Sequence, residues 1–386
     1  MSGVREERWF TRSLAAVCLG GLAIVAVMGL VQVRFGSYDM TLGQAWRGVF
    51  DPAVLLDPRW LLNFFLGEEL MRTVTGFTGE LPDLATETLV VWSIRLPRVF
   101  VAMLVGANLA VSGAIFQAVT RNELASPFIL GVSSGAGLMI LLTLVVLSGV
   151  TIALGGITLT PSALLPVIAA LGGAGAFLIV YVIAWKNGTS PVRLVLAGVI
   201  VSTVFGSLQT GMFYFADDLG VVQSAIAWTT GSLTGVGWEQ FRMALPWTVL
   251  ALALALLAAR QLNVLLLGEQ TAKSLGMSVE KVRFALSGVA VLAAAASIAV
   301  AGIVGFVGLI VPHMVRNLVG GDNRQVLMGC LFAGPALMVT ADVGARLFFT
   351  VVTGSPQQMP VGIVTGLVGG PYFLYLMRRQ EALGQL

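Results

Sequence analysis

The sequence predicts an all-α integral membrane protein with ten membrane-spanning helices and both termini on the cytoplasmic side. Of its 386 residues, 57% are hydrophobic and only 11% are charged, a balance that ordinary globular proteins do not show. The apolar residues form runs close to the roughly 20 residues that a helix needs to cross a bilayer. Lysine and arginine gather in every second connection between these runs, which indicates the cytoplasmic side. Residues 1–386 are therefore predicted to form a single transmembrane domain.

The apolar runs, taken in chain order, define the ten spans. The first, residues 14–33, has no small-residue cleavage site after it and is interpreted as a retained anchor. The other nine are residues 96–119, 128–147, 163–185, 194–216, 243–262, 284–304, 306–319, 326–350 and 361–377. The seventh and eighth form one nearly continuous apolar stretch. We expect a turn between them at Gly302, Gly305 or Gly308.

Charge supports ten spans better than hydropathy does. With an inner N-terminus, ten spans place 14 of the 22 basic residues on the cytoplasmic side. Merging the seventh and eighth spans would leave 11 basic residues on each side. That division would remove the positive-inside bias.

Two outer segments are predicted. Residues 34–90 form an extended outer loop with eight acidic residues and four arginines. Its aromatic residues favour either a short amphipathic helix on the membrane surface or a packed loop; they are Trp46, Phe50, Trp60, Phe64 and Phe65. Residues 217–233 have apolar side chains at helical spacing and are expected to lie across the opening between the fifth and sixth spans.

Several kinds of chemistry are not supported by the sequence. It contains no phosphate-binding loop of the type G-x-x-x-x-G-K-[ST] and no strand-linked dinucleotide motif. Its two cysteines lie in apolar stretches, and its one histidine, His313, is interpreted as a structural hydrogen-bonding residue. No metal site and no bound cofactor are therefore expected. The spans carry almost no acidic residues, which disfavours an ion-coupled carrier; Asp342 and Arg346 are interpreted as a local ion pair near the outer end of the ninth span.

Small residues recur along one face of the fifth and tenth spans. Such faces let two helix backbones approach closely in lipid. The residues are Gly198, Ser202, Gly206 and Thr210 on the fifth span, with polar Gln209 beside them, and Gly362, Gly366 and Gly370 on the tenth. They either pack within one subunit or line a translocation path and meet a second subunit.

Residues 261–283 lie inside the cell and combine leucines with charged residues. Leu265, Leu266, Leu267, Leu275 and Met277 alternate with Glu269, Gln270, Lys273 and Ser274. This pattern predicts two short helices broken at Gly276. An amphipathic element of this kind docks in a groove of another protein; the alternative is a helix lying against the lipid headgroups.

Five stretches, covering most of the chain after residue 92, resemble one family. They are RLPRVFVAMLVGANLAVSGAIFQAVTRNELASPFILGVSSGAGL (95–138), LLLGEQTAKSLGM (265–277), GFVGLIVPHMVRNLVGGDNR (305–324), ADVGARL (341–347) and MPVGIVTGLVGGPYFLYLMRR (359–379). These residues are similar to those of the iron-siderophore, haem and vitamin B12 permeases, the type II importers of the ABC transporter superfamily. The region before residue 92 departs from the family, since its first outer loop is longer.

The resemblance implies a permease of the plasma membrane that pairs with a second copy or a paralogue across a two-fold axis. Two cytoplasmic ATPase subunits would hydrolyse ATP with Mg²⁺, and an extracytoplasmic binding protein would deliver substrate. The chain would itself be no enzyme. The family's coupling element, which sits in a cleft of the ATPase, matches Leu267, Gly268, Glu269, Gln270, Ala272, Lys273, Ser274, Leu275 and Gly276.

The same resemblance assigns roles at the outer side. The family's arginines that pair with carboxylates of the binding protein match Arg95, Arg98 and Arg346. The alternative for Arg95 and Arg98 is that they anchor the second span at the headgroups. WTTGSL (228–233) is closer to the siderophore and haem members than to the vitamin B12 members. The expected substrate is an iron-siderophore-type chelate, with haem or vitamin B12 as alternatives. Two other classes stay open: an ion-coupled secondary carrier and a membrane scaffold that transports nothing.

Overall fold

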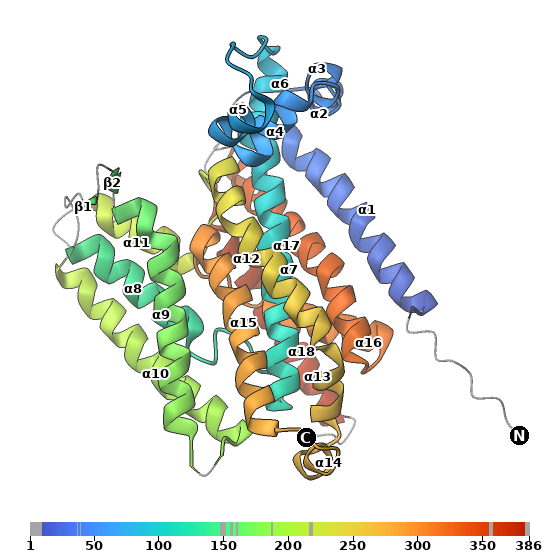
Figure 1. The fold of residues 1–386 in the computed structure, drawn as a ribbon, viewed down its shortest axis with the longest axis vertical. Helices are drawn as coiled ribbons and strands as arrows, with labels where there is room; N and C mark the ends of the chain where they lie inside the picture. Colours follow the sequence, from blue (N-terminus) through green and yellow to red (C-terminus); the bar gives the residue numbers. More distant parts are fainter. Residues whose placement is uncertain are drawn as a thin grey trace, which may run out of the picture.

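The computed structural model describes residues 10–36, 38, 40–146, 152–154, 157–159, 161–186, 188–215, 219–354 and 358–382. These residues form a helical bundle (Figure 1). The long helices are α1 (Arg12–Arg34), α7 (Leu96–Thr120), α9 (Pro161–Ala184), α10 (Pro191–Met212), α12 (Trp238–Leu257), α15 (Val279–Ala301), α17 (Asn323–Thr353) and α18 (Val361–Ala382). Two shorter apolar helices are α8 (Val132–Val146) and α16 (Val307–Val319).

The remaining elements lie between or beyond these helices. On the first long connection are α2 (Leu42–Val49), α3 (Pro52–Leu55), α4 (Pro58–Leu66), α5 (Glu68–Thr75), α6 (Thr86–Val90) and a π-helical turn, η1 (Val91–Arg95), that runs into α7. Later connections hold η2 (Phe213–Phe215), α11 (Leu219–Thr230), α13 (Ala259–Leu266) and α14 (Glu269–Ser274). A small antiparallel hairpin, β1 (Ile152–Leu154) with β2 (Ile157–Leu159), departs from the all-helical prediction.

The protein is a multi-pass membrane protein by helix length and composition. In the part of the chain that the structure describes, seven helices are long and apolar enough to cross a membrane. They correspond to the predicted spans other than the third, eighth and tenth. Shorter apolar stretches of helix occupy those three positions: α8 (Val132–Val146), α16 (Val307–Val319) and the apolar part of α18, Val361–Tyr375.

The predicted turn between the seventh and eighth spans is present as a short break in the helix. Helix α15 ends at Ala301 and α16 begins at Val307. Gly302 has a φ of 67°, a conformation that glycine adopts without steric cost. The α16 helix has only 13 residues, about 20 Å at 1.5 Å per residue, which is why the continuous stretch holds a full span and a short one.

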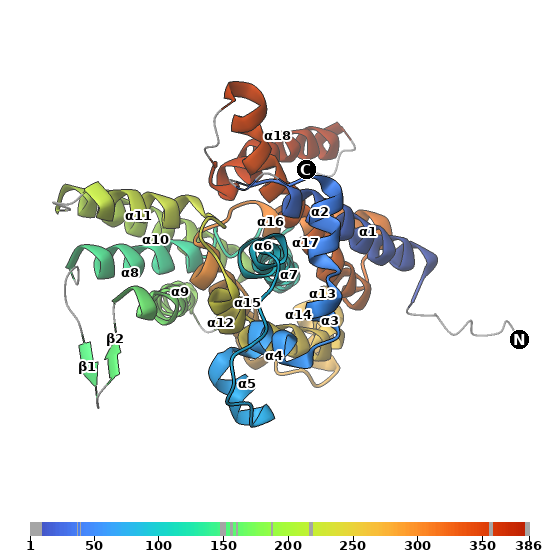
Figure 2. The ribbon, with the colours of Figure 1, turned by 90° about the horizontal axis from the view of Figure 1, so that it is seen from above.

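Helix α7 lies at the centre of the bundle, between α15, α16 and α17 (Figures 1 and 2). Glycines set how closely its neighbours approach. A Cβ added to Gly106 would lie 2.3 Å from the carbonyl oxygen of Gly334 on α17. One added to Gly113 would lie 1.7 Å from the carbonyl oxygen of Gly308 on α16. Because no side chain separates these backbones, α7 packs directly against both helices.

The two ends of the bundle carry different elements. Helices α2 to α6 gather at one end, and α14 lies at the opposite end (Figure 1). This placement agrees with the prediction that residues 34–90 and 261–283 face opposite sides of the membrane.

The predicted outer loop is a folded cap. Phe64 stacks on Trp92 and Trp238, and Phe65 packs edge-on against Phe100 and Trp238. These aromatic contacts fasten α4 onto the outer ends of α7 and α12. Of the two interpretations offered by the sequence, the packed one holds for Phe64 and Phe65, whereas Trp46 and Phe50 stay exposed on α2.

The close approach of α7 and α17 at Gly106 predicts that a larger residue there would disturb the packing. We expect Gly106→Ala to lower the thermal unfolding midpoint of the purified protein, because its methyl group would overpack the crossing at a cost of about 1–3 kcal/mol. Gly20→Ala on α1 is the control, since nothing lies within 4 Å of its added Cβ. Equal midpoints for the two variants would show that the α7–α17 crossing can relax.

Candidate functional site

The candidate coupling element is a pair of short helices at the end of the bundle opposite the cap. Helix α13 ends at Leu266, and α14 runs from Glu269 to Ser274. The break between them lies at Gly268, which has a φ of 111°. The predicted break at Gly276 is also present: with a φ of 81°, this glycine separates α14 from α15. The sequence did not predict the break at Gly268.

Two leucines on this element point away from the protein. Leu267 and Leu275 are 61% and 65% exposed, and Gln270, Lys273 and Ser274 are exposed beside them. Leu265 and Ala272 are buried and hold the element against the bundle. Leu265 therefore does not belong to the exposed leucine face that the sequence suggested.

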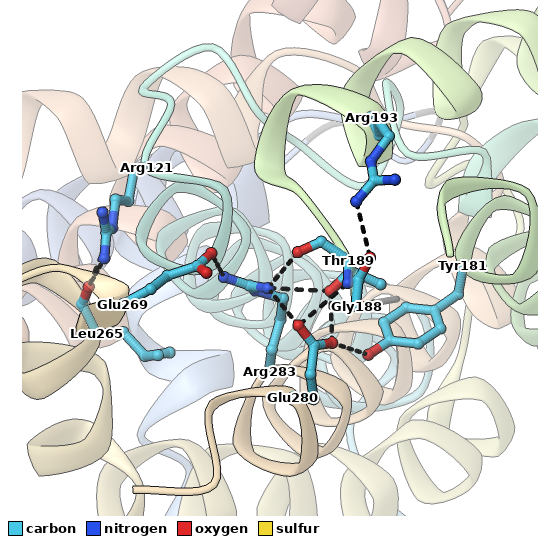
Figure 3. Close-up of polar contacts among 9 residues, drawn as sticks. All are labelled: Arg121, Tyr181, Gly188, Thr189, Arg193, Leu265, Glu269, Glu280 and Arg283. Atoms are coloured by element: carbon cyan, nitrogen blue, oxygen red, sulfur yellow. Dashed lines mark hydrogen bonds and ion pairs between the residues drawn. The ribbon is translucent and has the colours of Figure 1, made fainter. Parts of the chain in front are cut away.

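A buried arginine on α15 holds α14 in place (Figure 3). Arg283 is 1% exposed. Its Nη2 donates to Glu269 Oε1 at 2.6 Å, and its Nη1 donates to Glu280 Oε1 at 3.0 Å and to the Thr189 carbonyl oxygen at 2.7 Å. Thr189 lies in the turn between α9 and α10, so one guanidinium joins the coupling helix, α15 and that turn.

The surrounding groups complete this contact network, as Figure 3 shows. Glu280 accepts from the Thr189 hydroxyl at 2.8 Å and from the Tyr181 hydroxyl at 3.3 Å. Arg193 Nη2 donates to the Gly188 carbonyl oxygen at 2.8 Å. At the end of α7, Arg121 donates through Nε and Nη2 to the Leu265 carbonyl oxygen at 3.0 and 2.6 Å. The coupling element is thus bound to α7 as well as to α15.

The ion pair also fixes the charge state of Glu269. The hydrogen bond from Arg283 holds the pKa of this carboxyl below its ordinary value of 4.5, against a smaller opposing effect of burial. A carboxyl with a lowered pKa contributes stability at pH values above its ordinary pKa, and this contribution is lost only as the pH falls through the lowered value. At neutral pH the link between α14 and Arg283 is therefore fully formed.

A second charged cluster lies at the end of α1, α7 and α17 that carries the cap (Figure 1). Asp342 is fully buried and accepts two hydrogen bonds from Arg98, from Nε at 2.8 Å and from Nη2 at 2.6 Å. Gln32 donates to the same carboxylate. Arg346 is farther away, with its Nε 3.8 Å from Asp342 Oδ2. The predicted local pair of Asp342 and Arg346 was therefore incomplete, because the principal partner comes from α7.

The arginines predicted to meet a binding protein all engage the chain itself. Arg98 also donates to Gln358, Arg95 donates to the Val33, Arg34 and Tyr38 carbonyl oxygens, and Arg346 donates to that of Phe35 at 3.1 Å. Arg95 and Arg98 are buried. Their role in docking stays a prediction, and it would require these guanidinium groups to exchange internal partners for external ones.

The small-residue faces of the fifth and tenth spans divide into packed and open positions. Added Cβ atoms at Gly198 and Gly362 would collide with the Ile129 and Thr230 carbonyl oxygens, whereas those at Gly206, Gly366 and Gly370 would meet nothing within 4 Å. Gln209 donates to the Ser134 carbonyl oxygen at 2.8 Å. Ser202 contacts the Phe128 carbonyl oxygen at 3.4 Å, and Thr210 donates to that of Gly206. The faces thus serve internal packing at one end and stay uncovered along α10 and α18.

Sequence reasoning missed the Arg283 network and one further pair. His313 Nδ1 lies 3.0 Å from Glu123 Oε2, which joins α16 to the loop after α7. No local spacing rule relates Glu269 to Arg283 or Glu123 to His313, so these two contacts had no signal in one chain. The pair of Glu280 and Arg283, three positions apart on one helix, did have such a signal. Among the described residues, no three His, Cys, Asp or Glu side chains gather as a metal site would require.

Residues 24–379 match the FecCD transport family. The chain is 37% identical to the iron(3+)-hydroxamate import permease FhuG of Bacillus subtilis, over 80% of this chain and 89% of that protein. It is 40% identical to the cobalamin import permease BtuC of Halobacterium salinarum, over 77% and 75%. It is 38% identical to the hemin transport permease HmuU of Yersinia pestis, over 75% and 84%.

One solved structure has a similar fold. It is described as an inward-facing metal-chelate type ABC transporter, and it aligns with a TM-score of 0.73 at 25% identity, covering 95% of this chain and 99% of that one.

The buried pair of Arg98 and Asp342 predicts that removing one of the two charges destabilises the protein more than removing both. We expect Asp342→Asn to destabilise the protein by about 3–5 kcal/mol, because it leaves buried Arg98 without its counter-charge. The double variant Arg98→Met with Asp342→Leu should lose less, and Glu68→Gln, which breaks an exposed pair with Arg72, should lose almost nothing. Thermal unfolding midpoints measure all three. A double variant less stable than Asp342→Asn would contradict this interpretation.

Proposed function

The chain belongs to the FecCD transport family, and from this premise we propose that it is the permease subunit of an ATP-driven importer for an iron-siderophore-type chelate. The relatives reported above are permeases of importers for iron(3+)-hydroxamate, cobalamin and hemin. The observation that carries the proposal for this chain is the coupling element, whose exposed leucines flank α14, a helix that buried Arg283 holds through Glu269.

The proposed topology has ten spans with both termini in the cytoplasm of a plasma-membrane protein. Seven helices of spanning length and three shorter apolar helices, all within the described residues, support it. The positive-inside bias favours the end that carries α14 as the cytoplasmic end.

The exposed face of α14 is proposed to dock in a cleft of a cytoplasmic ATPase subunit. Leu267 and Leu275 would enter that cleft, with Gln270, Lys273 and Ser274 at its rim. ATP and Mg²⁺ would be held by the ATPase, and no cofactor by this chain. ATP binding can shift the permease between outward-open and inward-open states only by as much as its affinity for the two states differs.

The translocation path is proposed to run along the uncovered faces of α10 and α18, opposite a second permease copy or a paralogue. On α10, the hydroxyl groups of Thr203, Ser207 and Thr210 donate to backbone carbonyl oxygens four residues earlier. The α10 side of the path therefore offers few free hydrogen-bond donors to a passing substrate. This supports a bulky chelate guided by shape, whose selection rests with an extracytoplasmic binding protein. Haem and vitamin B12 are the alternative substrates within this class.

The buried charges disfavour an ion-coupled carrier as the second candidate. A carrier needs a membrane carboxylate that can release and bind its ion. Asp342, buried in the outer part of α17, has two hydrogen bonds from Arg98 and one from Gln32, which leaves it committed to structural pairing.

Reconstitution in liposomes with an ATPase and a binding protein tests the proposed function. We expect uptake of an iron-siderophore chelate to require ATP and to be independent of proton and Na⁺ gradients. Uptake that follows an ion gradient without ATP would establish the carrier instead. Binding of all partners with no flux under either condition would indicate a scaffold.

Docking of the ATPase is tested separately. We expect Leu267→Asn with Leu275→Asn to reduce co-purification of the ATPase strongly, because both apolar contacts would be lost. Val74→Asn, an equally exposed position on α5 in the cap, is the control. Retention of the ATPase by the double variant would remove these leucines from the proposed contact.

A further inference from the structure

Helix α2 of the cap has one face packed and one face exposed. On the packed side Ala45 and Gly48 are buried, and Trp92 Nε1 donates to the Gly48 carbonyl oxygen at 3.0 Å. On the other side Leu42, Trp46 and Phe50 recur every four residues and are 57%, 53% and 48% exposed. The rings of Trp46 and Phe50 lie 4.6 Å apart. An exposed apolar stripe of this kind marks a surface that contacts another protein or lipid.

The position of α2 along the bundle gives its depth in the membrane. Helix α1 ends at Arg34, and α2 begins at Leu42 and packs against it. The outward side of α1 carries exposed Leu19, Leu22 and Val27, a face suited to lipid. Helix α1 has 23 residues and is about 34 Å long at 1.5 Å per residue, enough to cross the hydrocarbon core. Its outer end therefore places α2 at the level of the headgroups.

The orientation of α2 also fits a membrane surface. Viewed from above, α7 is seen end-on while α2 is seen along its length, and α6 lies on the inner side of α2 (Figure 2). Helix α2 thus runs across the end of the bundle, roughly parallel to the membrane plane. Since Gly48 faces Val91 of η1, the stripe on the other side of α2 faces away from the bundle axis.

A groove continues from the stripe and carries charge. About 500 Å³ in volume, it is lined by Trp46, Arg47, Phe50, Asp51, Glu87 and Thr88, among others. Arg47 is exposed and has no ion pair within the described residues. Aromatic rings gather at the level of the headgroups, and a guanidinium beside them can donate charge-assisted hydrogen bonds to a lipid phosphate.

We propose that α2 is an in-plane interfacial helix that holds a phospholipid of the outer leaflet. Leu42, Trp46 and Phe50 enter the boundary between headgroups and acyl chains, and Arg47 contacts the phosphate. The cap is then fastened twice: to the bundle by Phe64 and Phe65 and to the lipid by α2. This inference concerns the outer leaflet alone, so its failure would leave the proposed function untouched.

Spin-label accessibility in lipid nanodiscs tests the proposal. Cysteine is introduced at Leu42→Cys or Phe50→Cys, and at Val74→Cys on α5 as the exposed control, in a chain whose buried native cysteines, Cys18 and Cys330, are replaced by alanine. We expect labels at 42 and 50 to collide more with oxygen than with a water-soluble nickel chelate, and the label at 74 to show the reverse. If the alanine background does not fold, the native cysteines stay, since both are buried.

Two outcomes would overturn the interfacial helix. One is equal access of the nickel chelate to positions 42, 50 and 74. The other is protection of 42 and 50 that develops only when a binding protein is added, which would make the stripe a protein-docking surface.

Lipid retention tests the phosphate contact. After purification in mild detergent, mass spectrometry should find a phospholipid retained by the natural chain and lost from Arg47→Gln. Arg72→Gln, which removes another exposed cap arginine, should retain it. Equal retention by Arg47→Gln and the natural chain would overturn the assignment of Arg47.

Discussion

The burial of Arg283 is the constraint on which the cytoplasmic end of this protein depends. A guanidinium withdrawn from water needs counter-charge and hydrogen-bond acceptors, and their absence would cost several kcal/mol. The chain supplies them from three places: Glu269 on α14, Glu280 on α15 and Thr189 in the turn that leads into α10. If any of these groups moved away, the Arg283 guanidinium would lose a hydrogen-bond acceptor or become exposed to water. A displacement of α14 is therefore passed to α15 and to the start of α10.

The centre of the bundle is suited to carrying such a displacement. Around α7, the close contacts are made by glycines and alanines whose backbones touch, as at Gly106 with Gly334 and Gly113 with Gly308. Interfaces of this kind have little side-chain bulk to deform, so packed helices shift as rigid bodies. At the outer end, Arg98 and Asp342 join α7 to α17 in the same way that Arg283 joins the inner elements. Charge pairs thus fasten both ends of a core that is otherwise apolar.

Much of this architecture follows from the sequence, and the parts that do not are long-range contacts. Hydropathy and charge located the apolar helices and placed residues 34–90 and 261–283 at opposite ends, because both signals are local. The pairing of Asp342 was misjudged because a four-residue spacing pointed to Arg346, whereas Arg98 is 244 positions away. The break at Gly276 was predicted, but the one at Gly268 was missed, because leucines continue on its N-terminal side and only the backbone geometry shows that the helix ends there. The burial of Leu265 comes from the packing of α13 against α7 and α17, which only the fold reveals.

The central claim is that the ion pair of Arg283 with Glu269 transmits movement of the ATPase-docking helix to the transport path. The most direct measurement is the ratio of chelate uptake to ATP hydrolysis in liposomes that contain the complete importer, comparing Glu269→Ala with Thr271→Ala, an exposed position on the same helix that is outside the proposed ATPase contact. The account predicts that Glu269→Ala still docks the ATPase and hydrolyses ATP but imports far less chelate per ATP, while Thr271→Ala keeps the natural ratio. An unchanged ratio for Glu269→Ala would contradict it.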